Sequence, residues 1–355
     1  MSTSDPRKSN LELLRILTIL TIVIGHFISQ SAICTNITGA NAIAAGFLSS
    51  GVRISVNVFL LIGTWFMVDS RFRPERIVDL YLTVALYTVP ITLVMLAAGR
   101  YGSTQNLIQG FLPFFGRPVW FATAYISLIA LTPFLSKVLL LDDKRLGKLS
   151  FILMFLFGAT ATVPCFTSID FIADFSWFCV IYIWIGWAKR TGFLERLPRG
   201  LPAIILGVGT TLALASARFV PALAWGIQYW LDNIKTLPNF LAALLVFNGF
   251  RTLELGTSRT INTLAKSVFA VYIIHQVPAF REFEWNTLLH AEAISAAAVP
   301  CFVGGIIVAA TAVFAAATIV DIIRNRLIFP LIKRSATYRH LVTFIERFYS
   351  DFSET

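Results

Sequence analysis

Charged residues are scarce in this chain, and most of those present are basic. They make up 14% of the 355 residues, whereas hydrophobic residues make up 57% and the mean hydropathy is +0.75. Soluble domains carry about 25% charged residues, so this balance excludes an ordinary soluble fold. The composition predicts an all-α, polytopic membrane protein with one membrane domain over residues 1–355, comprising a helical bundle at about 10–325 and a basic tail at 326–355.

Several features that would indicate other classes of protein are also lacking. The four cysteines do not have the spacing of metal ligands, so we expect no metal and interpret them as packing residues: Cys34, Cys165, Cys179 and Cys301. The apolar segments lack the period-two alternation of barrel strands. No basic groove with interleaved aromatic residues appears, so we expect no nucleic-acid partner. No cleavable signal peptide or strong internal repeat is evident.

Apolar segments approaching or exceeding the roughly 20 residues of a membrane span recur along the chain. Backbone groups in lipid must be satisfied within the segment, so these segments should be helices. We expect about ten of them: 11–30, 50–68, 77–98, 118–140, 147–164, 172–189, 200–218, 237–256, 261–280 and 297–322.

The distribution of Lys and Arg predicts the orientation. Basic residues concentrate before the first span, in alternate loops and in the tail, whereas the intervening loops carry few. Cytoplasmic segments of membrane proteins are enriched in Lys and Arg, so we expect both termini to lie in the cytoplasm. We expect the protein to be in the inner (cytoplasmic) membrane of the cell. The net charge of +10 is then a consequence of topology.

The first span carries an ionisable pair, Arg15 and His26. Eleven residues separate them, which returns the two side chains to nearly one helix face about 16 Å apart along the axis. Ionisable residues within a membrane are costly and usually functional. Glu12 lies one turn before Arg15 and can pair with it. The alternative is an Arg that extends to the interface and a His satisfied in the core.

Two further groups of residues lie at the two ends of the predicted bundle. The first cytoplasmic loop carries Arg73 and Arg76, and guanidinium groups bind phosphate, although positive-inside charge explains them equally. Tyr272 and His275 lie one turn apart in the ninth span, at about the depth of His26. Because the chain has four histidines, two at this depth favour a polar site facing outward over two core residues.

Taken in order, these motifs resemble the acyltransferase-3 family of integral membrane acyltransferases. The matching stretches are Glu-x-x-Arg with His eleven positions after the Arg, SSGVRISVNVFLLIGTWFM, Arg73-Pro-Glu-Arg76, PVWFATAYISLIALTPFL and KSVFAVYIIHQV, and they cover about residues 10–325. The chain looks most similar to stand-alone polysaccharide O-acetyltransferases. It departs from the family pattern at Asn57, where relatives often have Pro, and at Gly63-Thr64, where they often have Ser-Gly.

The resemblance implies a mechanism and roles. Acetyl-CoA, or another acyl-CoA, would be the donor substrate, its phosphates near Arg73 and Arg76 and its thioester arm near Arg15. His26 would act on an acceptor hydroxyl of a saccharide as general base or transient acyl carrier, in a catalytic group with Arg15 and Glu12. The remaining candidates for acceptor contacts are His275, Tyr272, Arg53, Trp120 and Tyr125. For Arg53, Trp120 and Tyr125, a role at the membrane interface is an equal alternative.

Two other functions remain compatible with the residues. Buried Arg and His also suit a proton-coupled secondary transporter or flippase for a saccharide or small metabolite. A sensor or scaffold would have the same topology without catalysis. The sequence does not identify the acceptor, the acyl group or the oligomeric state.

Overall fold

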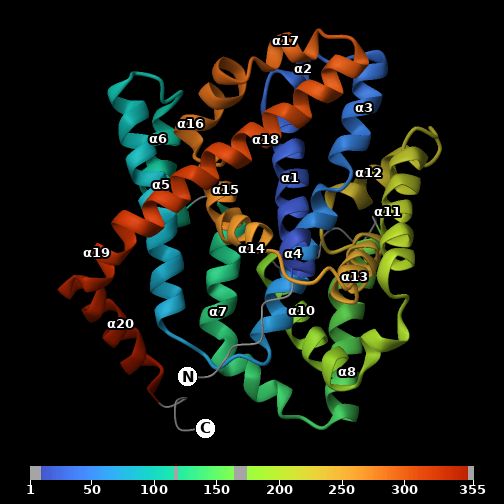
Figure 1. Ribbon diagram of the computed structural model, residues 1–355. Helices are drawn as coiled ribbons and strands as arrows, with labels where there is room; N and C mark the ends of the chain where they lie inside the picture. Colours follow the sequence, from blue (N-terminus) through green and yellow to red (C-terminus); the bar gives the residue numbers. More distant parts are fainter. Residues whose placement is uncertain (1–8, 116–118, 164–173, 351–355) are drawn as a thin grey trace. The chain divides into compact units, whose positions relative to one another are not determined.

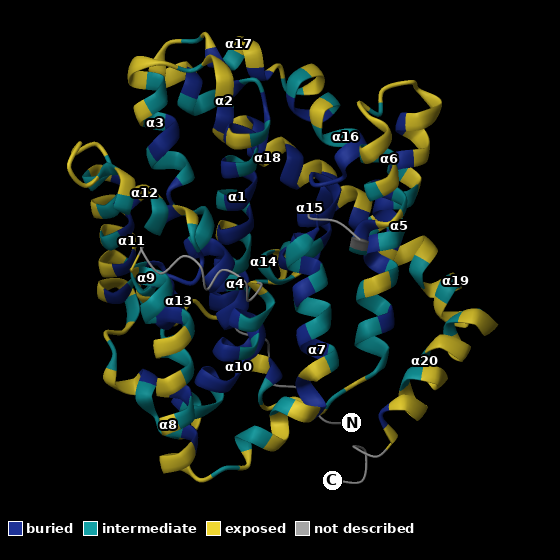
Figure 2. Ribbon diagram, turned by 180° about the vertical axis from the view of Figure 1, so that it is seen from behind, coloured by how far each residue is buried: buried dark blue, intermediate teal, exposed yellow. Residues whose placement is uncertain are grey.

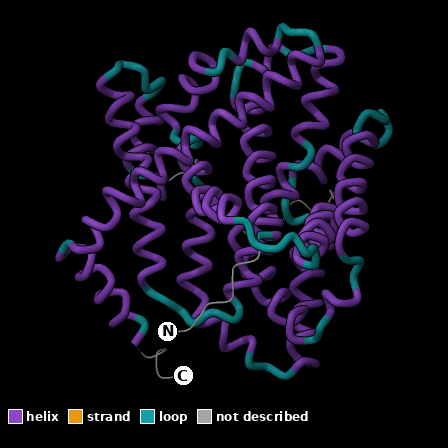
Figure 3. Tube along the Cα trace, in the orientation of Figure 1, coloured by secondary structure: helices purple, strands orange, loops and turns teal. Residues whose placement is uncertain are grey.

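The computed structural model describes residues 9–115, 119–163 and 174–350. Within these residues every regular element is helical and none is a strand (Figure 3). The order of the helices along the chain can be followed in Figure 1. Because every regular element of the described residues is helical, the all-α prediction is confirmed. Cys165, one of the cysteines interpreted as packing residues, lies outside the described residues, as does the N-terminal segment before Ser9.

Seven helical segments among the described residues are long and apolar enough to cross a membrane. They are Asn10–Gln30, Gly39–Met67, Glu75–Ala97, Trp120–Leu139, Asp143–Thr162, Gly200–Ala217 and Val299–Arg334. Each overlaps one of the ten predicted spans. The other three predicted spans are also helical, but α10 (Asp174–Arg190) and α13 (Leu237–Arg251) are shorter than 18 residues. The chain is thus a multi-pass membrane protein.

The predicted span at 261–280 is interrupted rather than continuous. It consists of α14 (Arg259–Leu264), the 3₁₀ turn η5 (Ala265–Ser267), α15 (Val268–Ile274) and the start of α16 (Pro278–Glu282). Val277 is extended, and Pro278 follows it in the first turn of α16. Proline fixes its own φ and disfavours helix in the residue before it, so α15 ends just before this point. His275 consequently lies at the C-cap of α15.

The chain divides into two compact units, each described by itself below. The first comprises residues up to Gly25, 42–70 and 134–265, and the second comprises residues 26–41, 71–133 and those from Lys266 onward. Helix α1 (Asn10–Gln30) therefore contributes its first sixteen residues to the first unit and the remainder, from His26, to the second. The first unit also contains α10, α13 and α14, whose bounds are given above. Its other helices are α3 (Gly39–Ser49, from Ala42), α4 (Val52–Met67), α8 (Asp143–Met154), η2 (Phe155–Ala159), α9 (Thr160–Thr162), η4 (Phe193–Arg196), α11 (Gly200–Ala217) and α12 (Ala224–Asp232).

Within the first unit, α4 is buried along most of its length (Figure 2). Asn57, at its centre, donates from its amide to the carbonyl of Ile234 at 2.8 Å and accepts from the indole of Trp177 at 2.9 Å. Proline has no such amide and could make neither contact. Asn57 therefore links α4 to α10 and to the segment before α13, which gives the departure from the family pattern a structural role.

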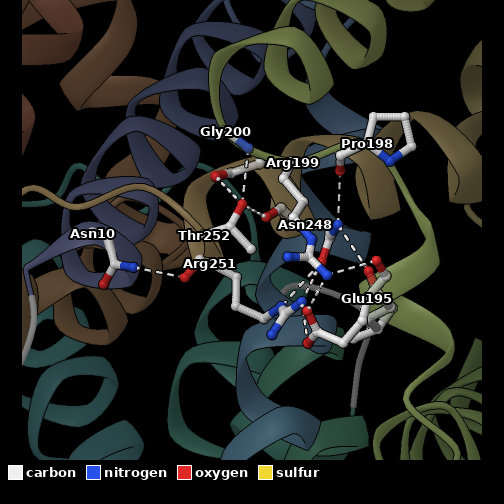
Figure 4. A network of polar contacts seen from close by, with 10 residues as sticks. Asn10, Glu195, Pro198, Arg199, Gly200, Asn248, Arg251 and Thr252 are labelled. Carbon is white, nitrogen blue, oxygen red and sulfur yellow. Dashed lines mark hydrogen bonds and ion pairs between the residues drawn. The ribbon is translucent and has the colours of Figure 1, made fainter.

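The start of α1 is held against the end of α13 in the first unit. The Asn10 amide lies within hydrogen-bonding distance of the carbonyls of Phe250, Arg251 and Leu253, which end that helix. Figure 4 shows the adjoining network, in which Arg251 pairs with Glu195 at 2.9 Å and also donates to the Asn248 side chain. Carbonyls at a helix C-terminus have no partner within the helix, so Asn10 supplies one.

In the second unit, charged residues are buried between α5 (Glu75–Ala97) and α18 (Val299–Ile323). Tyr87 donates to the Asp321 carboxylate at 2.6 Å, and Arg324 donates to Asp321 at 3.0 Å and to the Thr83 hydroxyl at 2.9 Å. Buried charges are tolerated when they are paired and hydrogen-bonded, as these are. The other helices of this unit are α2 (Ile33–Asn36), α6 (Thr104–Phe111), η1 (Pro113–Phe115), α7 (Trp120–Leu139, up to Pro133), η6 (Phe283–Leu288), α17 (Ala291–Ser295) and η7 (Arg324–Ile328).

The tail forms α19 (Phe329–Arg334) and α20 (Ala336–Phe348), and α20 packs on α5 of the second unit. Lys333 and the Tyr338 hydroxyl both bind Asp79, at 2.7 and 2.8 Å. Tyr349 donates to the carbonyl of Ala130 at 2.8 Å. The described part of the segment predicted as a basic tail, up to Ser350, is therefore mostly helical and attached to other residues of the second unit, and its cytoplasmic location remains a prediction.

Candidate active site

His26 and His275 meet in the second unit, although they come from different helices. The Nδ1 atom of His26 lies 2.9 Å from the Nε2 atom of His275, and the two ring centroids are 5.2 Å apart. His26 is in the last two turns of α1 and His275 caps α15. His275 is fully buried, whereas His26 is partly accessible. Two residues that the sequence singled out separately are thus one hydrogen-bonded pair.

The proton arrangement of this pair follows from the second nitrogen of His275. Its Nδ1 atom lies 2.6 Å from the carbonyl oxygen of Val271, which can only accept a hydrogen bond. Nδ1 of His275 therefore carries the proton, and in the neutral ring Nε2 is an acceptor. His26 then donates to it from Nδ1, which makes Nε2 of His26 the nitrogen with the lone pair. An imidazole held in this tautomer is suited to act as a base.

Two glutamines extend the pair. Nε2 of the Gln276 amide lies 2.9 Å from Nδ1 of His26 and donates to Oε1 of Gln30 at 3.0 Å. The tautomer assigned above needs an acceptor opposite Nδ1–H, so it requires the Gln276 amide to be rotated by 180°, which exchanges its nitrogen and its oxygen. The sequence analysis did not identify either residue. Their positions could have indicated them, because Gln30 is one turn after His26 and Gln276 follows His275 directly.

Aromatic side chains cover the His275 side of the histidine pair. The Trp285 ring lies 5.9 Å from the His275 ring and 5.1 Å from Phe27, measured between centroids. Both Trp285 and Phe27 are fully buried. A low-dielectric wall strengthens the hydrogen bonds within the site. Sequence reasoning missed Trp285 because it lies ten residues beyond His275, after the break in the helix.

Tyr272, a predicted contact residue, connects the histidines to α7. Its ring is 6.2 Å from that of His275, and its hydroxyl accepts from the backbone N–H of Phe121 at 3.3 Å. That N–H is in the first turn of α7, where it has no partner within the helix. The predicted residues Trp120 and Tyr125 both pack on Phe121 with ring centroids 6.0 Å apart, and Phe121 packs on Tyr272 at 5.9 Å.

Glu12 and Arg15 form the predicted ion pair within the first unit. Nη1 of Arg15 lies 3.5 Å from the Glu12 carboxylate, and the Glu12 side chain is almost completely buried. Arg53, at the start of α4 in the same unit, is half-buried. Its assignment to the acceptor remains a prediction, as do the catalytic assignments of Glu12 and Arg15.

Arg73 and Arg76 flank the first residues of α5 in the second unit. Arg73 is exposed and precedes Pro74, which caps the helix, while Arg76 is in its first turn and half-buried. Neither guanidinium group forms an ion pair with another described residue. The first turn of a 23-residue helix also presents backbone N–H groups and the positive end of the helix dipole. The two side chains and the helix end together form a surface that is receptive to phosphate.

Among the described residues, no group of three or more His, Cys, Asp and Glu side chains is arranged to hold a metal ion. A histidine pair that contacts amide and carbonyl partners, and that is covered on one side by aromatic rings, can supply a base for the transfer of a group. The family model of the acyltransferase domain called acyltransferase 3 matches residues 8–320. That is most of the chain, so the chain belongs to this family and is a membrane acyltransferase with an acyl donor and an acceptor. The chain has no significant match among curated proteins or among solved structures.

Proposed function

We propose that the protein is an O-acetyltransferase of the cell (cytoplasmic) membrane, which moves an acetyl group from cytoplasmic acetyl-CoA to a hydroxyl of an extracytoplasmic or lipid-linked saccharide. The observation that carries the proposal is the His26–His275 pair, because its hydrogen bonds select the tautomer in which Nε2 of His26 is a base. A neutral imidazole has an ordinary pKa of about 6.5 and can exchange a proton near neutral pH.

In the transfer step, Nε2 of His26 removes the proton from the acceptor hydroxyl. The oxygen then attacks the thioester carbonyl, and the bond between the carbonyl carbon and sulfur breaks. The ester remains on the saccharide, and the CoA thiolate takes the proton from His26 or from solvent. During this step the imidazole becomes positively charged, and its Nδ1–H bond to His275 strengthens because it is then charge-assisted. If His26 is instead the acyl carrier, Nε2 attacks the thioester itself and the acetyl-imidazole passes the group to the hydroxyl.

Donor binding is assigned to Arg73 and Arg76. Their guanidinium groups and the N-terminus of α5 would hold the CoA phosphates, and Arg15 would contact the thioester arm. Tyr272, Trp120, Tyr125 and Arg53 remain candidates for contacts with the acceptor.

The test is the variant His26→Ala, with His340→Ala on the exposed surface of α20 as the matched control. The purified proteins in lipid nanodiscs are assayed for transfer of radiolabel from acetyl-CoA to envelopes of cells that lack the protein. A positioned base contributes about 10²–10⁴ in rate, so His26→Ala should lose at least 100-fold while His340→Ala keeps full activity. Near-normal transfer by His26→Ala would refute the assignment, and wild-type protein that neither binds nor cleaves acetyl-CoA would favour the transporter.

A further inference from the structure

The segment between α15 and α18 contains two polar groups that no described residue satisfies. In η6, a π-helical turn over Phe283–Leu288, Oε2 of Glu284 and Nε1 of Trp285 are buried and have no hydrogen-bond partner among the described residues. Burying a polar group without a partner costs about 1–3 kcal/mol, so such atoms need an explanation. One is an acceptor and the other a donor, and they belong to consecutive residues.

These residues adjoin the histidine pair. The Trp285 ring packs between His275 and Phe27, the residue that follows His26, at the centroid distances given above. In the same segment, the Asn286 side chain accepts from the backbone N–H of Ala32, just after α1. The segment is thus fixed on both sides of the pair, to the C-terminal end of α1 and to the end of α15. Isolated π-helical turns occur frequently at functional sites.

The chemistry of the two groups points to a hydroxyl ligand. Burial raises the pKa of Glu284 to about 8, so its carboxyl is mainly neutral at pH 7 and offers both an O–H and a carbonyl oxygen. The Trp285 indole adds an N–H donor. A hydroxyl group is at once a donor and an acceptor, and neighbouring hydroxyls on a sugar ring would satisfy both groups.

We propose that Glu284 and Trp285 bind neighbouring hydroxyls of the acceptor saccharide and thereby present another of its hydroxyls to His26. This assignment rests on the proposed acetyl transfer and adds to it the residues that position the acceptor. It places acceptor recognition in the segment after the helix break, apart from the donor-binding loop at Arg73 and Arg76.

The experiment compares three variants with a control. Glu284→Leu removes both hydrogen-bonding atoms, Glu284→Gln keeps an acceptor and a donor, and Trp285→Phe removes the N–H but keeps a ring. The control is Glu282→Leu, because Glu282 is exposed two residues earlier in the chain. Each protein in nanodiscs is assayed for its acetyl-CoA affinity by calorimetry. Its apparent KM for the acceptor is measured with envelopes of cells that lack the protein, before and after periodate, which cleaves neighbouring diols.

Loss of one or two neutral hydrogen bonds should raise the acceptor KM about threefold to tenfold in Glu284→Leu and Trp285→Phe. Glu284→Gln should stay within about threefold of the wild type, and acetyl-CoA affinity should be unchanged in all variants that fold. Treatment of the envelopes with periodate should abolish the difference in acceptor KM between the wild type and the variants. Unchanged acceptor KM in both Glu284→Leu and Trp285→Phe would overturn the proposal. Equal losses of acetyl-CoA affinity and transfer would also overturn it, because they indicate a structural role. Failure of the proposed function is distinct, since wild-type protein would then transfer no acetyl group at all.

Discussion

His275 should act on the reaction only through His26, and a double-mutant cycle can measure this. Replacing His275 with Ala removes the acceptor that faces Nδ1 of His26 at 2.9 Å. In the ground state the bond joins neutral groups and contributes about 0.5–1.5 kcal/mol. In the transition state His26 carries positive charge, and a hydrogen bond to a charged group contributes about 1.5–3 kcal/mol.

Because the bond is present in both states, the difference between the two values, about 1–1.5 kcal/mol, sets the expected loss. At 1.36 kcal/mol per factor of ten, His275→Ala should lower the rate of acetyl transfer about 5-fold to 13-fold. His26→Ala should lower it by about 10²–10⁴. Without the base there is nothing left for His275 to orient. The double variant should therefore be no slower than His26→Ala alone, as found for residues that act as a unit.

The assay is single-turnover transfer from labelled acetyl-CoA, with acetyl-CoA affinity measured beside it by calorimetry. The affinity should be unaffected in all three variants, because none of them alters Arg73 or Arg76. His340→Ala again provides the control for loss of an imidazole elsewhere. Losses that multiply in the double variant would show that His275 contributes independently, and the orienting role would be wrong.

Three further outcomes are expected. Replacing Arg73 and Arg76 together with Ala should weaken acetyl-CoA binding at least tenfold in calorimetry, because two charge-assisted contacts of about 1.5–3 kcal/mol each are lost. Lys at both positions should restore part of the affinity, whereas unchanged affinity in the double Ala variant would mean that these residues only set the topology. Asp321→Ala leaves Arg324 buried without its carboxylate and should destabilise the protein by about 3–5 kcal/mol, measured as a lower thermal midpoint in detergent. Asp321→Asn should cost less, because the amide oxygen still accepts from Tyr87. Equal thermal midpoints for Asp321→Ala and the wild type would contradict the buried ion pair. Single cysteines introduced at 137–148 and in α20 should react with a membrane-impermeant maleimide only after the membrane is permeabilised, because the basic residues place both segments in the cytoplasm; labelling of intact cells at 137–148 would reverse the predicted orientation.

The long helices and the two histidines could be predicted because both depend on local pattern. Apolar runs of span length indicate a helix wherever they occur. An ionisable side chain within such a run indicates a functional residue without any knowledge of its partner. Hydropathy does not indicate where a helix breaks, however. The window at 261–280 is apolar enough on average to be predicted as one span, yet Pro278 ends the helix inside it and places His275 at its cap.

Residues whose role depends on a distant partner were not predictable. Gln30 and Gln276 are ordinary polar residues until the two helices bring them within 3.0 Å of each other. Asn57 appears as a departure from the family pattern, and its partners lie 120 and 177 positions further along the chain. Phe121 and Trp285 are aromatic residues in an aromatic-rich sequence, and nothing local distinguishes them from interfacial or core residues.

The buried contacts between α5 and α18 also bear on how the protein is made. Tyr87 and Asp321 are 234 positions apart, and at about 5–20 residues per second the ribosome takes roughly 12–47 s to synthesise the chain between them. During that time the Tyr87 and Thr83 side chains in α5 lack the partners that they have in the finished protein. Asp321 and Arg324 enter the bilayer with α18, three residues apart and already paired, which reduces the cost of inserting each charge. A chain that stops before Asp321 therefore keeps α5 in a state that membrane proteases and chaperones can recognise as incomplete, and insertion of α18 ends that state.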